Sequence, residues 1–313
     1  MQSDTATSAS RRFHAGVAPA ASLGKLRRNP MWAEVVIYAV LLVAGAVTLL
    51  PMVVVFARSL SPSYIISSYP LLLWPRDLTL EAYEYVFQTN TLTRSFWITV
   101  FVTVTGTTLN LAFTIPGAFG LSKRHVPGNR LLMGIIVFAM LFHAGIVPTY
   151  ILVNRLGLLN SLWALIIPVL VSPFNVILMR NYFWSVPAEL EDSAKIDGAS
   201  DLQVLLRIIV PLSKPAIATI GLFYAVSHWN DFFRALFYIT DNSKWPLQLL
   251  LRSIVINSNF QNMGAVDSGR QAFVNPENIK AASIVFATVP ILLVYPFLQK
   301  YFVKGIMLGA VKG

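Results

Sequence analysis

Polar, aromatic and ionisable side chains gather near the end of one long apolar segment. Trp229, Asn230 and Asp231 are consecutive, and Arg234 follows three residues after the aspartate. Ionisable groups inside a membrane span are costly and usually face a cavity or a partner. The i,i+3 spacing places Asp231 and Arg234 for an ion pair on one helix face. These residues form one candidate site, either for a ligand or for hydrogen bonds between helices.

A second group of candidate residues lies in segment 187–215, which is rich in carboxylates at its start. Pro187 suits the first turn of a helix, and the carboxylates that follow complement the positive end of the helix dipole. Gly198 permits a left-handed backbone and can end that helix. A second apolar set then recurs at helical spacing: Leu202, Leu205, Leu206 and Ile209. The segment predicts two short helices joined at Gly198 and stopped by Pro211 and Pro215; a solvated connector is the alternative.

Other kinds of chemistry find little support in the sequence. Cysteine is absent, so thiolate chemistry, disulfides and Cys-ligated metals are excluded. The four histidines show no metal-ligand spacing, and no glycine-rich nucleotide loop of the Walker type is present. We predict no catalytic residues and no metal site. Asn110, His143 and Asn175 lie within or near apolar segments, where hydrogen bonds between helices are expected, with substrate contact as the alternative.

The composition is that of a membrane protein. The chain has 313 residues, of which 56% are hydrophobic and 12% are charged. A soluble domain carries about a quarter charged residues, so the composition argues against an ordinary cytosolic enzyme and against intrinsic disorder. The formal charge of +10 is interpreted as Lys and Arg in cytoplasmic loops, and no nucleic-acid partner is expected.

Six apolar segments predict an all-α polytopic membrane protein with six transmembrane helices, because a span needs about 20 apolar residues. The predicted spans are 35–57, 96–121, 131–153, 162–180, 215–239 and 281–303. Residues 1–34 are expected to be a disordered cytoplasmic tail, and residues 35–313 the transmembrane domain. The fourth span contains Pro168 and Pro173, and prolines free backbone carbonyls that neighbouring helices must satisfy.

Lys and Arg residues set the expected orientation. The segments on one side of the predicted spans hold 15 of them and those on the other side hold 8. The positive-inside rule then places both termini and segment 187–215 in the cytoplasm. Of the two long segments left outside, 58–95 predicts an amphipathic helix at the membrane interface. We expect the apolar start of 240–280 to fold onto the rest of the protein.

The 187–215 segment resembles the EAA loop of ABC importer permeases, the membrane subunits of ATP-driven uptake systems. Asp192, Ser193 and Ala194 stand where that family has Glu-Ala-Ala, and Gly198 takes the glycine position. Ile208 and the Val210-Pro211 pair take the later positions, with Val replacing Leu. The resemblance runs from about residue 35 to the end and is strongest to the carbohydrate uptake type 1 branch, including importers of pectin fragments and alginate. Three stretches carry this narrower likeness: 223–230, 245–248 and 295–305.

The resemblance implies the fold of a type I ABC importer permease and a mechanism. The cytoplasmic helical coupling loop would dock in a cleft of a separate ATPase dimer, which binds ATP and Mg. Its coupling residues would be Glu191, Asp192, Ser193, Ala194, Asp197, Gly198, Ile208 and Pro211. We expect Glu191 and Asp192 to be exposed and to meet basic groups of the ATPase. Bulky or charged replacement of Gly198 is expected to uncouple ATP hydrolysis from transport.

The resemblance also implies partners and a substrate. The expected partners are a second permease subunit in a heterodimer, the ATPase dimer, an extracytoplasmic solute-binding protein and the lipid bilayer of the bacterial inner membrane. The cargo would be an oligosaccharide, with Trp229, Asn230 and Asp231 on its path. The alternatives are a secondary transporter driven by an ion gradient, for which no internal repeat is visible, and a membrane enzyme, for which no catalytic constellation is visible.

Overall fold

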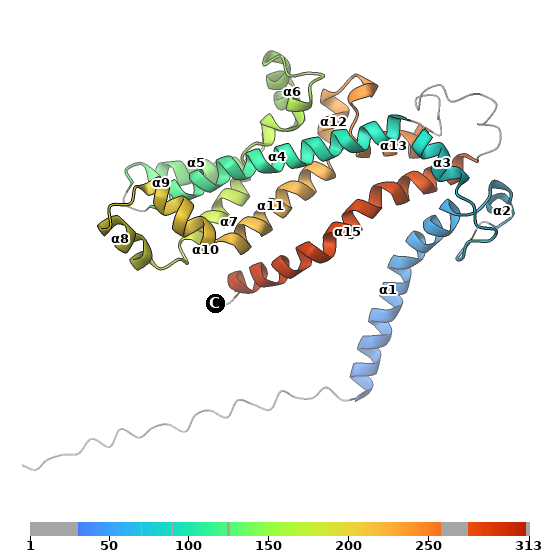
Figure 1. Cartoon of the computed structure of the whole chain (residues 1–313), viewed down its shortest axis with the longest axis horizontal. Helices are drawn as coiled ribbons and strands as arrows, with labels where there is room; N and C mark the ends of the chain where they lie inside the picture. Colours follow the sequence, from blue (N-terminus) through green and yellow to red (C-terminus); the bar gives the residue numbers. More distant parts are fainter. Residues whose placement is uncertain (1–30, 70, 89, 124–125, 258–274, 311–313) are drawn as a thin grey trace, which may run out of the picture. The chain divides into compact units, whose positions relative to one another are not determined.

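The computed structural model describes residues 31–69, 71–88, 90–123, 126–257 and 275–310, and every regular element in these ranges is helical (Figure 1). The elements are, in order, α1 Met31–Ser59, α2 Ser63–Ser68, α3 Glu81–Gln88, α4 Asn90–Ser122, α5 Asn129–Leu141, α6 Ile146–Arg155, η1 Leu162–Leu165, η2 Ile167–Val169, α7 Pro173–Phe183, α8 Ala188–Ile196, α9 Asp201–Val204, η3 Leu205–Ile209, α10 Val210–Leu212, α11 Lys214–Trp229, α12 Phe233–Tyr238, η4 Asn242–Lys244, α13 Leu247–Asn257 and α15 Pro276–Ala310. The predicted all-α class is confirmed.

The chain divides into two units, and the boundary falls inside α1. The first unit ends at Leu50, and the second begins at Pro51 and contains all later elements. In the first unit the described part is the start of α1, an apolar helix that begins at Met31. Most of the predicted tail, residues 1–30, lies outside the described residues.

Three of the six predicted spans are single helices. Among the described residues, α1, α4 and the first part of α15 are long and apolar enough to cross a membrane. They contain the predicted spans 35–57 and 96–121 and the described start of span 281–303. Each of the three helices begins a few residues before the predicted span, and the bounds of the spans in the membrane stay predictions.

The other three spans are broken, which the sequence analysis did not predict. Span 131–153 consists of α5 and α6, bent by 114° at a break of a few residues, and the span from η1 to α7 is bent by 50°. Span 215–239 ends at Trp229 and resumes as α12. Counted as one span each, the bent pairs found in the described residues bring the total to as many as six. In that count the third pair joins 201–212 to α11 at an angle of 84°.

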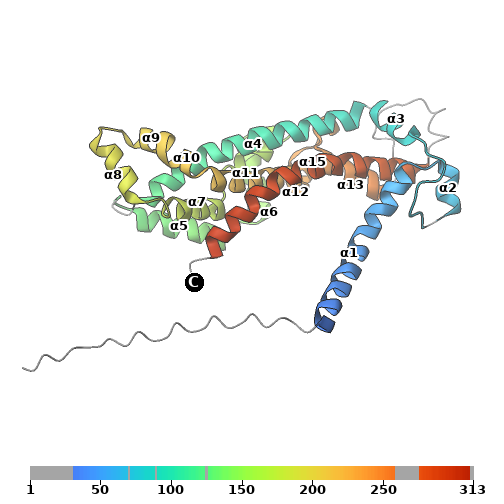
Figure 2. The same cartoon turned by 60° about the horizontal axis from the view of Figure 1, so that its bottom comes forward.

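Helix α4 is the centre of the second unit. It packs along α11 and α7, and α11 packs in turn against α15 (Figures 1 and 2). Buried side chains of α4, α7 and α11 share one apolar cluster with Val204, Leu205 and Ile209. This cluster joins the helix pair of segment 187–215 to the membrane helices.

Both long segments predicted to lie outside carry folded helices. In segment 58–95, α3 buries Ala82, Tyr85 and Val86 and exposes Glu81 and Glu84, so the predicted amphipathic helix is confirmed. In segment 240–280, α13 inserts three buried side chains into the cluster beneath α3: Leu247, Leu250 and Ile254. The start of that segment therefore folds onto the protein as expected, whereas 258–274 lies outside the described residues.

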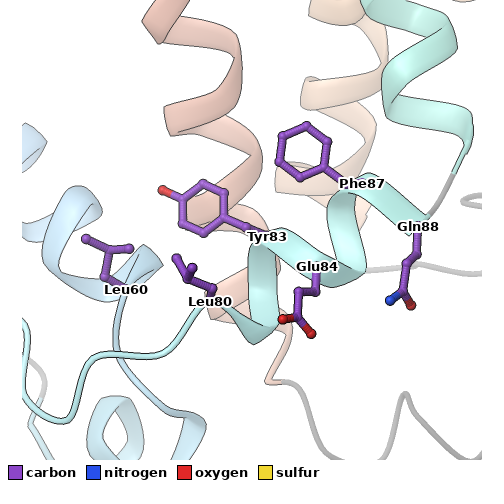
Figure 3. Close-up of a pocket in the computed structure, with 6 residues that line it drawn as sticks. All are labelled: Leu60, Leu80, Tyr83, Glu84, Phe87 and Gln88. Carbon is purple, nitrogen blue, oxygen red and sulfur yellow. The ribbon is translucent and has the colours of Figure 1, made fainter.

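A groove of about 620 Å³ lies beside α3 (Figure 3). It is lined by Leu60, Leu80, Tyr83, Glu84, Phe87 and Gln88. The Tyr83 hydroxyl lies 2.8 Å from the hydroxyl of Ser59, which fixes one wall of the groove. None of the candidate site residues lines it, so it is a surface feature separate from both candidate sites.

Candidate functional site

The first helix of segment 187–215 lies at the surface and contacts the apolar core through Ala194. Helix α8 has no buried residue, and Ile196 at its end is 85% exposed. Pro187 occupies the N-cap position, and Glu189 and Glu191 lie in the first turn. The predicted helix start is confirmed.

Gly198 forms the turn after α8, as predicted. Its φ of +83° is left-handed, a conformation that side chains with a Cβ disfavour. The backbone N–H groups of Gly198 and Ala199 donate to the carbonyls of Lys195 and Ala194, at 3.0 and 2.9 Å, which satisfies the open end of the helix. An added Cβ at Gly198 would meet nothing within 4 Å. Glycine is therefore needed for its backbone conformation and not for space.

The second helix of the segment begins at a capping box. The backbone N–H of Gln203 donates to the Ser200 hydroxyl, and the Gln203 side chain accepts from the backbone N–H of Ser200. The helix continues through the π-helical turn η3 and ends at Leu212, so the two-helix prediction is confirmed. Of its apolar set, Leu205 and Ile209 are buried, whereas Leu202 and Leu206 are exposed.

Four charged side chains form a connected set of ion pairs in and beside this segment. Glu191 forms an ion pair with Lys123, which follows the end of α4. Its other oxygen lies 3.2 Å from Lys195, and Lys195 lies 3.2 Å from Asp201. Burial alone would raise the pKa of Glu191, but hydrogen bonds from the two lysines outweigh it and hold the pKa below its usual value. The Glu191 carboxylate is thus ionised and held between the two lysines.

The prediction that Glu191 is exposed is wrong. We expected an exposed carboxylate that meets a partner, but the Glu191 side chain is only 18% exposed and its oxygens are taken by two lysines. Lys123 was missed because it lies 68 residues away and no local pattern joins the two. The only feature of the sequence that indicated a role for Lys123 was its position in a short basic loop at the end of a predicted span.

The other predicted coupling residues divide between surface and core. Asp192, Ser193, Asp197 and Pro211 are exposed together with Gly198, whereas Ala194 and Ile208 are partly buried. Ala194 packs against the cluster that joins α4, α7 and α11. Exposed apolar side chains accompany them: Leu190, Ile196, Leu202 and Leu206. One face of the segment is therefore anchored, while carboxylates and apolar groups remain uncovered in this chain.

The second candidate site lies at a break in the fifth span. Helix α11 ends at Trp229, and Arg234 Nε lies 2.7 Å from a carboxylate oxygen of Asp231, which confirms the predicted ion pair. Trp229 is partly buried, with its ring 6.1 Å from that of Phe96 on α4 in an edge-to-face contact. Asn230 is exposed, and its side chain donates to the carbonyl of Val226. Of the three predicted substrate-path residues, Asn230 is exposed in this chain, whereas Trp229 and Asp231 are partly buried.

Asn110 joins three spans in the interior. Its amide nitrogen donates to the carbonyls of Val169 and Leu170, at 2.7 and 2.8 Å, in the broken fourth span. Its oxygen lies 2.8 Å from Nε2 of the buried His228 on α11. The predicted interhelical hydrogen bonds of Asn110 are confirmed. They satisfy carbonyls at the break before α7, where Pro173 has no N–H to donate to Val169. We call Asn110, His228, Val169 and Leu170 the buried junction.

The remaining polar candidates lie apart from both sites. His143 is exposed at the break between α5 and α6, and Asn175 is buried in α7. His228 was not a predicted site residue, since a lone histidine in an apolar helix carries no spacing signal. Within the described ranges, no three His, Asp or Glu side chains are grouped so as to hold a metal ion.

These features define a polytopic membrane subunit with a small helical segment standing outside its bundle. Residues 114–308 match the family of binding-protein-dependent transport system inner membrane components, and the chain belongs to this family. It is a membrane-spanning permease subunit of a transport system, as the resemblance implied.

Individual relatives agree with this assignment. The chain is 49% identical to protein LplC of Bacillus subtilis (strain 168), over 86% of this chain and 91% of that protein. It is 45% identical to the polygalacturonan/rhamnogalacturonan transport system permease protein YtcP of the same organism, over 90% and 98%. Its structure matches a chain of a bacterial ABC transporter involved in the import of the acidic polysaccharide alginate, with a TM-score of 0.82, 35% identity and coverage of 88% and 98%.

Proposed function

We propose that this chain is a permease subunit of an ATP-driven importer of oligosaccharides derived from acidic polysaccharides. The observation that carries the proposal is the agreement of two independent relatives. YtcP is named for polygalacturonan and rhamnogalacturonan, and the solved transporter imports alginate. These are all polymers rich in uronic acids, and both relatives cover nearly the whole chain.

In this proposal, segment 187–215 receives the push of a separate ATPase dimer, which binds ATP and Mg. Helix α8 and the turn at Gly198 are short and capped, so they transmit a displacement as a rigid body. Exposed Asp192 and Asp197 offer charge to basic groups, while Ile196 and Leu202 offer apolar surface that only a partner can cover. The segment and both termini lie in the cytoplasm.

A second permease subunit completes the path across the membrane, and an extracytoplasmic binding protein delivers the sugar. The path passes the end of α11, where Asn230 binds sugar hydroxyls. Trp229 and Asp231 belong to the same wall, with Trp229 held by Phe96 and Asp231 neutralised by Arg234. Asn230→Ala is expected to weaken transport more than Trp229→Ala, since Asn230 is the exposed member.

The test starts from native membranes. The tagged chain is purified in mild detergent, and the proteins that accompany it are identified by mass spectrometry. We expect an ATPase, a second permease and a binding protein. The purified complex is then reconstituted in vesicles, and uptake of oligogalacturonate is compared with uptake of a neutral oligosaccharide of equal length, with and without ATP.

Each outcome separates the proposal from its alternative. ATP-dependent uptake of the acidic sugar supports it, and ATP-dependent uptake of the neutral sugar alone would overturn the substrate class. Purification of the chain by itself, with uptake driven by a proton or sodium gradient, would establish a secondary transporter instead.

A further inference from the structure

Helix α8 is tied to the membrane helices by its backbone and by one ion pair. The backbone joins α8 to α7 through residues 184–187, and on the other side it runs from Gly198 through α9, η3 and α10 into α11. The ion pair joins Glu191 of α8 to Lys123, which follows directly after α4. Through this pair α8 contacts the end of a helix to which its own backbone does not lead, because α4 is a separate helix that packs along α7 and α11.

Lys123 is a firm attachment point because the end of α4 is itself tightly held. The carbonyl of Leu121 accepts from Arg180 Nε at 2.8 Å and from the Asn129 amide at 3.0 Å. The carbonyl of Ser122 accepts from the Trp184 indole N–H at 2.7 Å. A helix end with satisfied carbonyls does not fray, so a force on the residue that follows it reaches the whole helix.

The Lys123 side chain is also fixed in place. Its ammonium lies 4.2 Å from the centre of the Phe119 ring, and the side chain is only 14% exposed. A cation beside the last turn of a helix is further favoured by the helix dipole. Because water screens it little, this ion pair is held more strongly than an exposed surface pair.

On the other side, Glu191 belongs to α8 and is supported by Lys195 one turn later. Lys195 reaches across the Gly198 turn to Asp201 at the start of α9. Lys195 therefore braces α8 against α9, whereas Lys123 is the partner of Glu191 that belongs to a different membrane helix. The two lysines that bind the Glu191 carboxylate therefore connect α8 to different helices.

We propose that the Lys123–Glu191 ion pair is a positioning contact through which a displacement of α8 moves α4 as well as α11. This inference rests on the proposed function of segment 187–215. Because α4 also carries Asn110 and packs on α7, the contact delivers the displacement to the helices that surround the buried junction. In this proposal neither Lys123 nor Glu191 contacts the sugar, and the ion pair acts only by keeping α8 and α4 together.

The experiment measures sugar uptake per ATP hydrolysed in the complete complex reconstituted in vesicles. Lys123→Gln and Glu191→Gln remove one charge each while keeping a side chain of similar length. We expect ATP hydrolysis to continue while uptake per ATP falls about tenfold, which lies within the range by which single residues modulate coupling between sites. The exchanged pair, Lys123→Glu with Glu191→Lys, should recover most of the uptake per ATP.

Lys195→Gln is the matched control. It removes a lysine from the same carboxylate but leaves the contact with Lys123 in place, so uptake per ATP should fall less than in Lys123→Gln. A purely structural role for Lys123 would reduce the amount of complex, ATP hydrolysis and uptake in proportion, leaving their ratio unchanged.

The outcomes decide between the ideas. An unchanged ratio in Lys123→Gln, failure of the exchanged pair to recover, or equal uncoupling by Lys195→Gln would each overturn the positioning contact. If Lys123→Gln yields too little complex, the exchanged pair decides alone, because it restores the attraction between α8 and α4. A wild-type complex without ATP-dependent uptake would instead overturn the proposed function, independently of these variants.

Discussion

Two helix breaks in this chain are stabilised in opposite ways. The turn at Gly198, between α8 and α9, is exposed and is held by its own residues, namely the glycine and the Ser200–Gln203 capping box. The break before α7 is held from a distance by Asn110, which lies 59 residues before Val169 in the chain. The first break depends on local backbone conformation, the second on contact between spans.

The difference follows from the surroundings of each break. At Gly198, water can form hydrogen bonds with any backbone group that loses its partner. The glycine turn and the capping box therefore each contribute only modestly to the free energy of unfolding. At the buried junction Asn110 and His228 are buried and the two carbonyls are partly buried, so a carbonyl that loses its partner there keeps more of the cost of its desolvation. Changes at the junction should therefore destabilise the protein more than changes at the turn.

Asn110→Leu should have the largest effect. It removes the donors to Val169 and Leu170 and the acceptor for His228. We expect the free energy of unfolding in detergent to fall by about 3 kcal/mol, because two partly buried carbonyls and the buried His228 each lose a hydrogen-bond partner. Denaturant unfolding of the purified complex followed by tryptophan fluorescence measures it.

Thr108→Val is the control for that experiment. Thr108 is on the same helix but is exposed, and it donates only to the carbonyl of Val104 within α4. Its substitution should leave the unfolding free energy nearly unchanged. Equal losses in Asn110→Leu and Thr108→Val would mean that the buried junction has no special value.

Gly106→Ala should have the next largest effect. A Cβ at this position would lie 2.5 Å from Nε2 of His228, so either the His228 ring must leave its hydrogen bond with Asn110 or α4 and α11 must move apart. Overpacking of this kind costs about 2 kcal/mol. The same unfolding experiment measures it, and Gly117→Ala is the matched control, since a Cβ there meets nothing within 4 Å.

Both alanines gain the same helix propensity, so the difference between the two variants isolates the clash. In a His228→Ala background, the difference should disappear, because the ring that blocks the Cβ is gone. A cost at Gly106 that persists in that background would place the close contact elsewhere.

The same contrast explains which features could be predicted from the sequence. Pro187, Gly198 and Pro211 act on their own neighbours, so the two helices of segment 187–215 were predicted correctly. The apolar segments likewise fall on helices of the structure. Each of these signals is local, because it depends on residues within one or two helical turns.

Contacts between distant residues carried no such signal. The sequence indicated that Asn110 would bond between helices, but not that it would reach the break beside Pro168 or meet His228. It predicted an exposed Glu191, since nothing nearby in the chain announces Lys123. The sharp bend between α5 and α6 was missed too, because its flanking residues are apolar and read as one continuous span.

Gly198→Val should have the smallest effect on stability and a large effect on transport. The left-handed φ of +83° costs a residue with a Cβ about 1 kcal/mol, and no neighbouring atom adds a steric term. The turn can relax only by rotating α8 away from its place, which should lower uptake per ATP in the reconstituted complex while ATP hydrolysis continues. Gly198→Asn is the matched control, because asparagine tolerates the left-handed region and should retain coupling. If valine and asparagine uncouple equally, the position needs a small side chain for its partner; if only valine does, it needs the backbone turn itself.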